Sequence, residues 1–414
     1  MAAVTELDAF RHEVRAFLAE AAPASLRGSA TTPFQGFWGG RLSAGANPDQ
    51  RLWFDRCLAR GWTVPHWPRR YGGADLPLDH YQAWKEELAA QGLPLPLVGF
   101  GLTMIGPILL AEGSEAQKAQ HLPRIAQGEV RWCQGYSEPG AGSDLASLRT
   151  RAVREGDDFI VNGQKTWTSH ADEADWIFCL VRTDPAARKQ AGISFLLIDM
   201  NSPGIRTRPI ELISGSSPFC EVFFEDVRVP VAHVVGPLHD GWRVAKSLLA
   251  HERGMVGESV AAGGARAPEL QNYSLAAHAR EAAGVDNEGR IADPLLRDAI
   301  LRCEMDQALM RLTVQRANDR LALGHPPGAE TSTLKLVGTE LNQRRWELAA
   351  RIAGAEGLGW SGDAFGERDR ALTRQWLRSR ANSIEGGTSE IQRNILARSV
   401  LGLPAGPKSP RKGP

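Results

Sequence analysis

Three things are scarce in this sequence: excess charge of one sign, long apolar runs and closely spaced cysteines. The 48 Lys and Arg residues are balanced by 48 Asp and Glu residues, and the pI is about 7.2. A balanced chain indicates no basic face, so nucleic acid is not an expected partner. No run of about 18 apolar residues occurs, so the sequence predicts no segment that spans a membrane.

The cysteines exclude two further classes of protein. They are odd in number, and none belongs to a Cys-x-x-Cys pair or a His/Cys cluster: Cys57, Cys133, Cys179, Cys220 and Cys303. This pattern argues against a disulfide framework and against a metal site, and is typical of free thiols in a reducing compartment. The N-terminal stretch carries charges such as Glu6 and Arg11, which argues against a signal peptide. We therefore expect a soluble cytoplasmic protein.

Most of the chain has helix-forming patterns, which lie on both sides of a β-rich middle region. Its 414 residues exceed what one hydrophobic core usually serves, so two or three domains are expected. From 131 to about 235, short Val- and Ile-rich runs are separated by Gly and Pro, which predicts strands. From 241 onward the patterns are helical, as they are at the N-terminal end over 4–20, 50–60, 77–91 and 115–127. The α–β–α order predicts an α+β protein whose sheet domain is flanked by helical bundles.

Two local signals for function lie in the β-rich middle. Residues 132–144, Trp-Cys-Gln-Gly-Tyr-Ser-Glu-Pro-Gly-Ala-Gly-Ser-Asp, predict a strand that breaks into a Pro/Gly turn, where glycine lets the backbone approach a ligand closely. Residues 161–169, Val-Asn-Gly-Gln-Lys-Thr-Trp-Thr-Ser, predict a hairpin at Asn162-Gly163 and then a strand that carries Trp167 and hydroxyl groups. Together they favour a site for a planar, polar-edged heterocycle, although each alone is equally consistent with an ordinary β-turn.

A third segment narrows the interpretation. Residues 384–398 begin Ile-Glu-Gly-Gly-Thr-Ser-Glu-Ile-Gln-Arg, where Gly386-Gly387 predict a turn and Thr388 predicts the N-cap of an amphipathic helix. These three segments, with Phe-Glu-Asp-Val-Arg-Val-Pro at 224–230, resemble the acyl-CoA dehydrogenase family of flavoproteins in order and spacing. The resemblance runs from near residue 5 to near residue 403.

The resemblance implies a fold and a reaction. The fold would have an N-terminal helical domain over 1–130, a middle β barrel over 131–237 and a C-terminal four-helix bundle over 238–403, followed by a disordered tail over 404–414. The reaction would be FAD-dependent α,β-desaturation of an acyl-CoA, in which a carboxylate removes the α-proton and the β-hydrogen leaves as a hydride to flavin N5. Hydrogen bonds to the thioester carbonyl would stabilise the enolate, and a dry pocket would raise the pKa of the base.

The resemblance also implies partners. Electrons would pass to an electron-transferring flavoprotein. The chain would form a homodimer or homotetramer, with a heteromer as the open alternative.

The catalytic base is where this sequence departs from the best-known members of the family. Their carboxylate stands one residue before the Gly-Thr of the C-terminal motif, and Gly386 occupies that position here. Some members place the base on the first helix after the β domain, just before an arginine, and His251-Glu252-Arg253 matches that pattern. The resemblance therefore favours Glu252 as the base, with Glu385 as the rival. An ion-paired, exposed Glu252 and no base at all are the remaining alternatives.

Other roles follow from position in the same way. The cofactor loop that in the family serves a neighbouring subunit's FAD corresponds to Arg351, Gly354 and Ala355, where Arg351 and Ala355 are substitutions. Coenzyme A contacts correspond to Ser143 and Arg253. The flavin contacts correspond to Gln134, Tyr136, Ser137, Trp167, Thr168, Ser169, Thr388 and Glu390. Trp167 also has an interpretation as plain core, because the chain contains 12 Trp.

A second departure concerns an Arg-x-x-Phe-Gly motif whose arginine reaches a partner subunit's FAD. The stretch 273–300 has no Phe-Gly pair, so contacts across a dimer must differ, with Arg280 or Arg297 as candidates. Similar departures occur in bacterial members that act on steroid side chains or other bulky acyl-CoAs. Two other functions stay open: a related flavin enzyme acting on another substrate, such as a nitroalkane, and a flavin-poor structural subunit of a heteromer.

Overall fold

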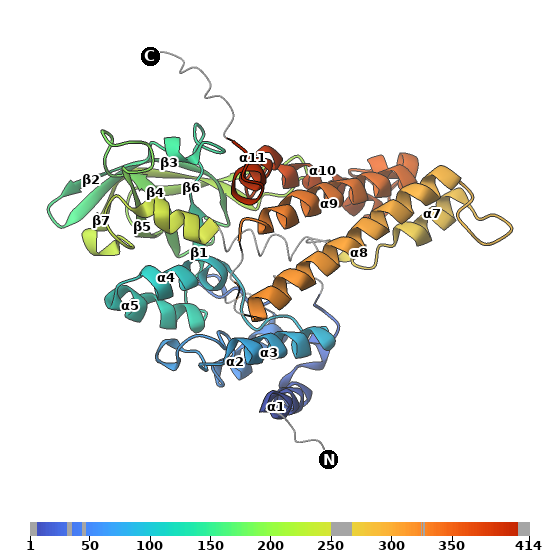
Figure 1. Cartoon of the computed structure of the whole chain (residues 1–414), viewed down its shortest axis with the longest axis horizontal. Helices are drawn as coiled ribbons and strands as arrows, with labels where there is room; N and C mark the ends of the chain where they lie inside the picture. The colour runs from blue at the N-terminus through green and yellow to red at the C-terminus, as the bar shows by residue number, and fades with distance from the viewer. Residues whose placement is uncertain are drawn as a thin grey trace, which may run out of the picture. The chain divides into compact units, whose positions relative to one another are not determined.

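The computed structural model describes residues 6–30, 35–43, 47–249, 267–323, 325 and 328–404. The chain divides into two compact units, Met1–Glu252 and Arg253–Pro414 (Figure 1). The first unit contains helices followed by a sheet, and the second contains helices. Within the described ranges, no helix has both the length and the apolar character needed to cross a membrane.

The helices of the first unit form where apolar residues recur on one face and polar residues cap the ends. α1 buries Phe10, Val14 and Leu18, which are four positions apart, in a cluster shared with α3. α5 begins with a capping box formed by Ser114 and Gln117. The bounds are α1 Glu6–Ala21, α2 Pro48–Leu58, α3 Leu78–Ala90, α4 Gly106–Glu112 and α5 Glu115–Ala126.

The strands of the first unit form one seven-stranded sheet. Neighbours follow the order β1-β4-β2-β3-β7-β6, and β5 also pairs with β4. β1 runs parallel to β4, whereas β3 pairs antiparallel with β7 along most of its length. The bounds are β1 Trp132–Gly135, β2 Arg151–Glu155, β3 Asp158–Ser169, β4 Trp176–Arg182, β5 Ile193–Asp199, β6 Ile205–Ile210 and β7 Phe219–Pro230.

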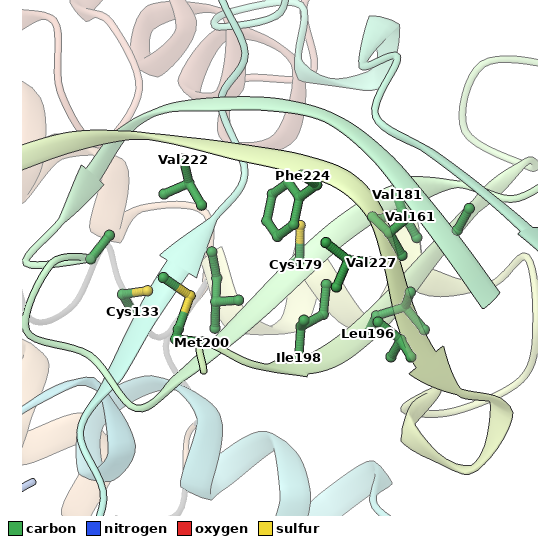
Figure 2. Packing of buried hydrophobic residues seen from close by; sticks show 14 of the residues in the cluster. Cys133, Val161, Cys179, Val181, Leu196, Ile198, Met200, Val222, Phe224 and Val227 are labelled. Carbon is green, nitrogen blue, oxygen red and sulfur yellow. The ribbon is translucent and has the colours of Figure 1, made fainter. Parts of the chain in front are cut away.

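Alternate residues of these strands point into a shared apolar core (Figure 2). Cys133 of β1, Cys179 of β4 and Cys220 of β7 all belong to this core and are fully buried. Burial raises the pKa of the Cys179 thiol to about 11. These cysteines therefore act as small apolar core residues, and their protonated thiols are poor nucleophiles.

The hairpin predicted at Asn162-Gly163 is wrong. The turn between β2 and β3 lies at 156–157, and Asn162 and Gly163 lie inside β3. The register with β7 shifts beside Gly163, as in a β-bulge. A Cβ atom at Gly163 would lie 2.6 Å from Thr150 Cα, so a close backbone approach accounts for this glycine.

The second unit is helical in the residues described. α8 and α9 are its longest helices, with 29 and 23 residues. Trp346 of α9 is fully buried in a cluster that also contains residues of α7, α8 and α10. The bounds are α7 Leu275–Ala283, α8 Pro294–Ala322, α9 Thr331–Ala353, α10 Glu367–Ser379 and α11 Ser389–Ile395. Residues 241–249, at the end of the first unit, are also helical.

Candidate functional site

The turn after β1 is fastened to β3 by a buried ion pair. Glu138 Oε1 lies 2.7 Å from Lys165 Nζ, and the two side chains are 8% and 0% exposed. The carboxylate of Glu138 also accepts the backbone N–H groups of Arg149 at 2.6 Å and Thr150 at 2.9 Å. Lys165 Nζ donates in addition to the carbonyl of Tyr136 at 3.2 Å. The first two sequence segments therefore lie side by side.

Glu138 stays ionised although it is buried. Burial alone would raise its pKa, but the charge of Lys165 and the hydrogen bonds from Lys165, Thr150 and Arg149 outweigh burial and hold the pKa below its usual value. Sequence reasoning missed both Glu138 and Lys165. The signal in the sequence was weak, because it consisted only of one acidic and one basic residue in the two segments predicted to flank a ligand.

Two of the predicted flavin-contacting residues carry buried polar atoms that have no hydrogen-bond partner among the described residues. These atoms are Gln134 Nε2 on β1 and Thr168 Oγ1 on β3. A buried polar group left unpaired costs about 1–3 kcal/mol. Folded proteins rarely keep such groups unless a ligand or an ordered water satisfies them. The two atoms therefore fit the polar edge of a bound ring.

The end of β3 has an unusual backbone. Trp167 and His170 have φ angles of 58° and 52°, in the left-handed region that residues other than glycine rarely occupy. Trp167 is 56% exposed, and its ring lies edge-on to Phe219 with the centroids 6.1 Å apart. The interpretation of Trp167 as plain core is therefore wrong. Strained backbone of this kind clusters at ligand sites.

The remaining candidates of the first unit differ in exposure. Tyr136 is buried, Ser137 and Ser169 are half-buried, and Ser143 is exposed on the turn. The carbonyl of Ser137 accepts the N–H of Thr166 at 2.9 Å. The structure thus brings the strand and turn residues of the first segment beside the end of β3, as a shared site requires.

In the second unit, the rival base Glu385 is engaged by its neighbours. Arg378 donates to both of its carboxylate oxygens, at 3.2 and 2.8 Å, and Asn382 Nδ2 donates to Oε1 at 2.5 Å. A bidentate guanidinium fixes the direction of a carboxylate. The next residue, Gly386, has a φ of 62°, so the predicted glycine turn is present.

Thr388 caps α11, as the sequence predicts, because its side-chain oxygen accepts the N–H of Ile391 at 3.2 Å. Ser389 Oγ and Gln392 Oε1 are buried without a partner among the residues described. Sequence reasoning missed them, although both belong to the quoted Thr-Ser-Glu-Ile-Gln-Arg motif. Glu390 is exposed, and hydrogen bonds from its own backbone and from Thr388 lower its pKa.

The predicted cofactor loop lies elsewhere in the second unit. Arg351, Gly354 and Ala355 are exposed at the C-terminal end of α9. α11 contacts α9 at a position nearer the start of α9 than Arg351, because Arg393, in α11, donates to Glu340 of α9 at 2.7 Å. Glu340 and Arg351 are about 16 Å apart along the helix at 1.5 Å per residue. This unit therefore does not bring the loop to Thr388.

Several predicted residues lie outside the described ranges. These are Glu252, Arg253 and the tail over 405–414. Of the two arginines considered for the missing motif, Arg280 is exposed on α7, and Arg297 donates to the carbonyl of Ile291 at 3.0 Å. Where side chains are described, no group of three or more His, Cys, Asp or Glu residues is arranged to hold a metal ion.

Comparisons with known proteins assign this arrangement to a class. Three family models match consecutive parts of the chain: the acyl-CoA dehydrogenase N-terminal domain at 5–129, the middle domain at 133–227 and the C-terminal domain at 239–401. The chain belongs to the acyl-CoA dehydrogenase family, a family of oxidoreductases. Members generally depend on FAD, and the buried unpaired atoms of Gln134 and Thr168 fit that cofactor.

Individual relatives match along nearly the whole chain. It is 38% identical over 401 residues to the acyl-CoA dehydrogenase IpdE1 of Mycobacterium tuberculosis, across 96% of this chain and 98% of that protein. The solved Tcur3481-Tcur3483 steroid ACAD is similar with a TM-score of 0.73 and 30% identity, across 97% of this chain and 98% of that one. The ChsE4-ChsE5 complex from Mycobacterium tuberculosis is similar with a TM-score of 0.70 and 29% identity, across 98% of this chain and 100% of that one. The predicted acyl-CoA dehydrogenase-like fold is confirmed.

Proposed function

We propose that this protein is an FAD-dependent acyl-CoA dehydrogenase that introduces an α,β double bond into an acyl-CoA thioester. The observation that carries the proposal is the pair of buried unpaired atoms, Gln134 Nε2 on β1 and Thr168 Oγ1 on β3, the strand that also carries the exposed indole of Trp167. An aromatic face suits a flat ring, and polar atoms suit its edge. The residues proposed to hold FAD are Gln134, Tyr136, Ser137, Trp167, Thr168, Ser169, Thr388 and Glu390.

When bound, FAD accepts a hydride from the β-carbon of the substrate. The task of the chain is to remove the α-proton, and we assign this task to Glu252. Support comes from the state of its rival, since both oxygens of Glu385 are occupied by Arg378 and Asn382. Gly386 supports the same assignment, because the position of the usual base carries no side chain.

The chain is proposed to act as an oligomer, a homodimer or a homotetramer. The exposed loop of Arg351, Gly354 and Ala355 supports this, because it is far along α9 from α11 and is available to the FAD of a neighbouring subunit. A stripe on α8 supports it too, because four apolar side chains at helical spacing are more than half exposed: Leu301, Met305, Leu309 and Leu312. A heteromer is the alternative, since one similar structure is described as a ChsE4-ChsE5 complex.

For the substrate we propose a bulky acyl-CoA such as a steroid-derived thioester, because one similar structure is named a steroid ACAD. Ser143 and Arg253 are assigned to coenzyme A. Electrons are proposed to pass to an electron-transferring flavoprotein.

The proposal is tested by purifying the protein and following its flavin absorbance during titration with straight-chain, branched and steroid-derived acyl-CoAs. We expect a yellow protein whose flavin is bleached most completely by a bulky thioester. A colourless protein that takes up no added FAD would instead support a structural subunit of a heteromer. A yellow protein that is bleached by a nitroalkane and by none of the thioesters would support a different substrate.

The base is tested by Glu252→Gln, which keeps the shape of the side chain and removes the proton acceptor. We expect FAD binding to persist and flavin bleaching to slow by several orders of magnitude, whereas Glu385→Gln should cost far less. Bleaching of Glu252→Gln at the wild-type rate would contradict the assignment. Gly386→Glu in the Glu252→Gln background should rescue only in part, because a side chain at a φ of 62° is strained.

A further inference from the structure

The strained end of β3 is not fixed by the sheet alone. The register of β3 and β7 shifts between Lys165 and Thr168, around Trp167, and pairing resumes at Thr168 and Ser169. The N–H of His170 then donates to the carbonyl of Pro218 at 2.9 Å. The left-handed φ angles of Trp167 and His170 persist only where the surroundings over-determine them. The sheet reaches as far as His170, so another contact must hold the loop that follows this residue.

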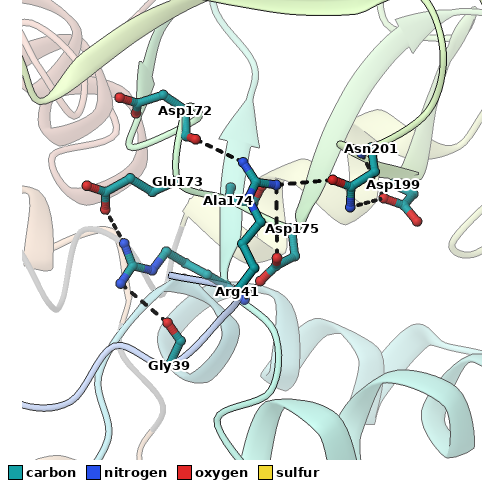
Figure 3. Close-up of polar contacts among 9 residues, drawn as sticks. Gly39, Arg41, Asp172, Glu173, Ala174, Asp175, Asp199 and Asn201 are labelled. Atoms are coloured by element: carbon teal, nitrogen blue, oxygen red, sulfur yellow. Dashed lines mark hydrogen bonds and ion pairs between the residues drawn. The ribbon is translucent and has the colours of Figure 1, made fainter. Parts of the chain in front are cut away.

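That contact comes from Arg41, which precedes α2 in the chain. Its guanidinium grips the loop over 170–175, which joins β3 to β4: Nη2 donates to the carbonyl of Asp172 at 2.9 Å and Nη1 to the carbonyl of Ala174 at 2.7 Å (Figure 3). Asp175 Oδ1 lies 4.0 Å from Nη1, and Asn201 Oδ1 accepts from the same nitrogen at 3.4 Å. One side chain thus binds two carbonyls of the loop, at Asp172 and Ala174, shortly after His170.

Two glycines allow the backbone before Arg41 to come close to the loop over 170–175. Gly39 and Gly40 have φ angles of 67° and 77°. A Cβ atom at Gly39 would lie 2.2 Å from the carbonyl oxygen of Gly128, and one at Gly40 would lie 2.8 Å from Asp175 Oδ2. A side chain at Gly40 would push the segment away from the loop, and one at Gly39 would push it away from Gly128, so the sequence Gly-Gly-Arg is suited to this close approach.

The same segment also touches the strained residue itself. The ring of Trp38 lies 5.2 Å from the ring of His170, centroid to centroid. Arg131 contacts both the segment and the loop. Its guanidinium lies 5.3 Å from the centre of the Trp38 ring and forms an ion pair with Glu173 of the loop. Its backbone N–H donates to Asp175 Oδ2 at 2.7 Å. The segment therefore holds the loop at His170 through Trp38 and at residues 172–174 through Arg41.

We propose that Arg41 is a positioning residue for the flavin. By clamping the loop over 170–175, it holds Trp167, Thr168 and Ser169 in the conformation that receives the ring, although it does not itself contact the ring. This inference rests on the proposed function, because it takes FAD as the ligand of those three residues.

The test compares Arg41→Ala and Arg41→Lys with Arg60→Ala. Arg60 lies in the same helical region, forms an ion pair with Glu13 at 2.7 Å and is 42% exposed, close to the 37% of Arg41, but it makes no contact with the loop. Hydrogen exchange is measured on the FAD-free protein over 166–175. FAD affinity and the reduction potential of the bound flavin are measured on the reconstituted protein.

Arg41→Ala should speed exchange over 166–175, weaken FAD binding about tenfold and shift the flavin potential, because the strained conformation is no longer held. Arg41→Lys, whose single ammonium replaces a two-nitrogen fork, should fall between Ala and wild type. Arg60→Ala should match the wild type in all three measurements. If Arg41→Ala does not fold, Arg41→Lys carries the test alone.

Wild-type exchange, affinity and potential in a folded Arg41 variant would overturn the inference. Equal effects of Arg60→Ala would overturn it too, because they would reveal only general loosening of the helical region. A wild-type protein that binds no FAD would count against the proposed function instead. The exchange measurement still decides whether Arg41 clamps the loop in that case.

Discussion

In the sheet of the first unit, Gln134 and Thr168 hold buried polar atoms that no described residue satisfies, whereas in the second unit Thr388 and Glu385 have their side-chain oxygens engaged. The cap of α11 explains Thr388, and Arg378 explains Glu385, without any ligand. An unpaired buried atom has no such explanation within the chain. The contrast supports the ring-binding site proposed at the sheet, but it holds for Thr388 and Glu385 and not for the whole second unit. Ser389 Oγ and Gln392 Oε1, beside the cap of α11, are buried and unpaired among the described residues as the two sheet atoms are.

The largest effect is expected from removing the buried ion pair between Glu138 and Lys165, which supports the sheet site. Lys165→Met should destabilise the protein by about 3–5 kcal/mol, because the carboxylate of Glu138 is left buried without its partner. The free energy of unfolding is measured by urea denaturation. The control is Arg344→Met in the second unit, which removes an ion pair with Asp306 whose side chains are 57% and 37% exposed and which should cost about 0–1 kcal/mol.

The double variant Glu138→Gln with Lys165→Met separates charge from packing. It should recover part of the loss, because no unpaired carboxylate remains buried. Equal destabilisation by Lys165→Met and Arg344→Met would mean that the sheet site is no more dependent on its buried pair than the second unit is on a surface pair.

How far the sequence predicted this arrangement depends on the distance between the residues involved. The strands and the cap at Thr388 follow from local patterns and were predicted, whereas Gln134 and Thr168 were selected only by the resemblance to the family. The pairing of Glu138 with Lys165 and the reach of Arg41 to the loop over 170–175 join residues far apart in the chain, and no local pattern encodes them. The turn predicted at Asn162-Gly163 failed because the same glycine also suits a bulge.

Helix α4 was missed for a related reason. It follows a π-helical turn over Gly101–Ile105, and both Gly106 and Pro107 stand at its start, so its seven residues offer too short a period to detect. The identity of the base is a different case. It rests on the match of Glu252 to a family pattern, and what the structure adds is the engagement of Glu385 by Arg378.

Thr168→Val tests whether the unpaired hydroxyl serves the ligand, because it replaces that hydroxyl with a methyl group of similar shape. FAD binding should weaken by about 1–3 kcal/mol, because a hydrogen bond to the ring is lost. The FAD-free protein should be at least as stable as the wild type, since the unpaired hydroxyl is unfavourable there. Calorimetric FAD titration and thermal unfolding of the FAD-free protein measure the two effects. A loss of stability without FAD, together with unchanged affinity, would show that the hydroxyl serves the fold.

A smaller effect concerns pH and is specific to the first unit. His121 is 1% exposed between Trp132 and Trp176, and burial first, then the positive charges of His233 and Arg124, lowers its pKa to about 4. The unfolded chain binds this proton near pH 6.5, so stability is lost as pH falls from 6.5 towards 4. At pH 5 the loss is about 2 kcal/mol at 1.36 kcal/mol per pKa unit.

The contribution of His121 is isolated by comparing His121→Phe with the wild type. The aromatic replacement fills the same space and cannot be protonated, so the difference between unfolding free energies at pH 7 and pH 5 should shrink by about 2 kcal/mol. His278→Phe is the control in the second unit, where the imidazole is half-buried and stacked on Tyr273. An unchanged pH profile in His121→Phe would rule out His121 as the source of acid sensitivity.

The smallest effect is expected where the second unit has satisfied its own side chain. Thr388→Ala removes the oxygen that accepts the N–H of Ile391, and loss of an N-cap costs about 1 kcal/mol. Thr388→Ser keeps that oxygen and should retain most of the stability. Because the cap is complete within the chain, this loss should be present without FAD, in contrast to Thr168→Val. With FAD the loss should be larger, because Thr388 is also among the residues proposed to hold the cofactor. An equal loss with and without FAD, measured by thermal unfolding in both states, would show that Thr388 serves only as a cap and would remove it from the residues proposed to hold FAD.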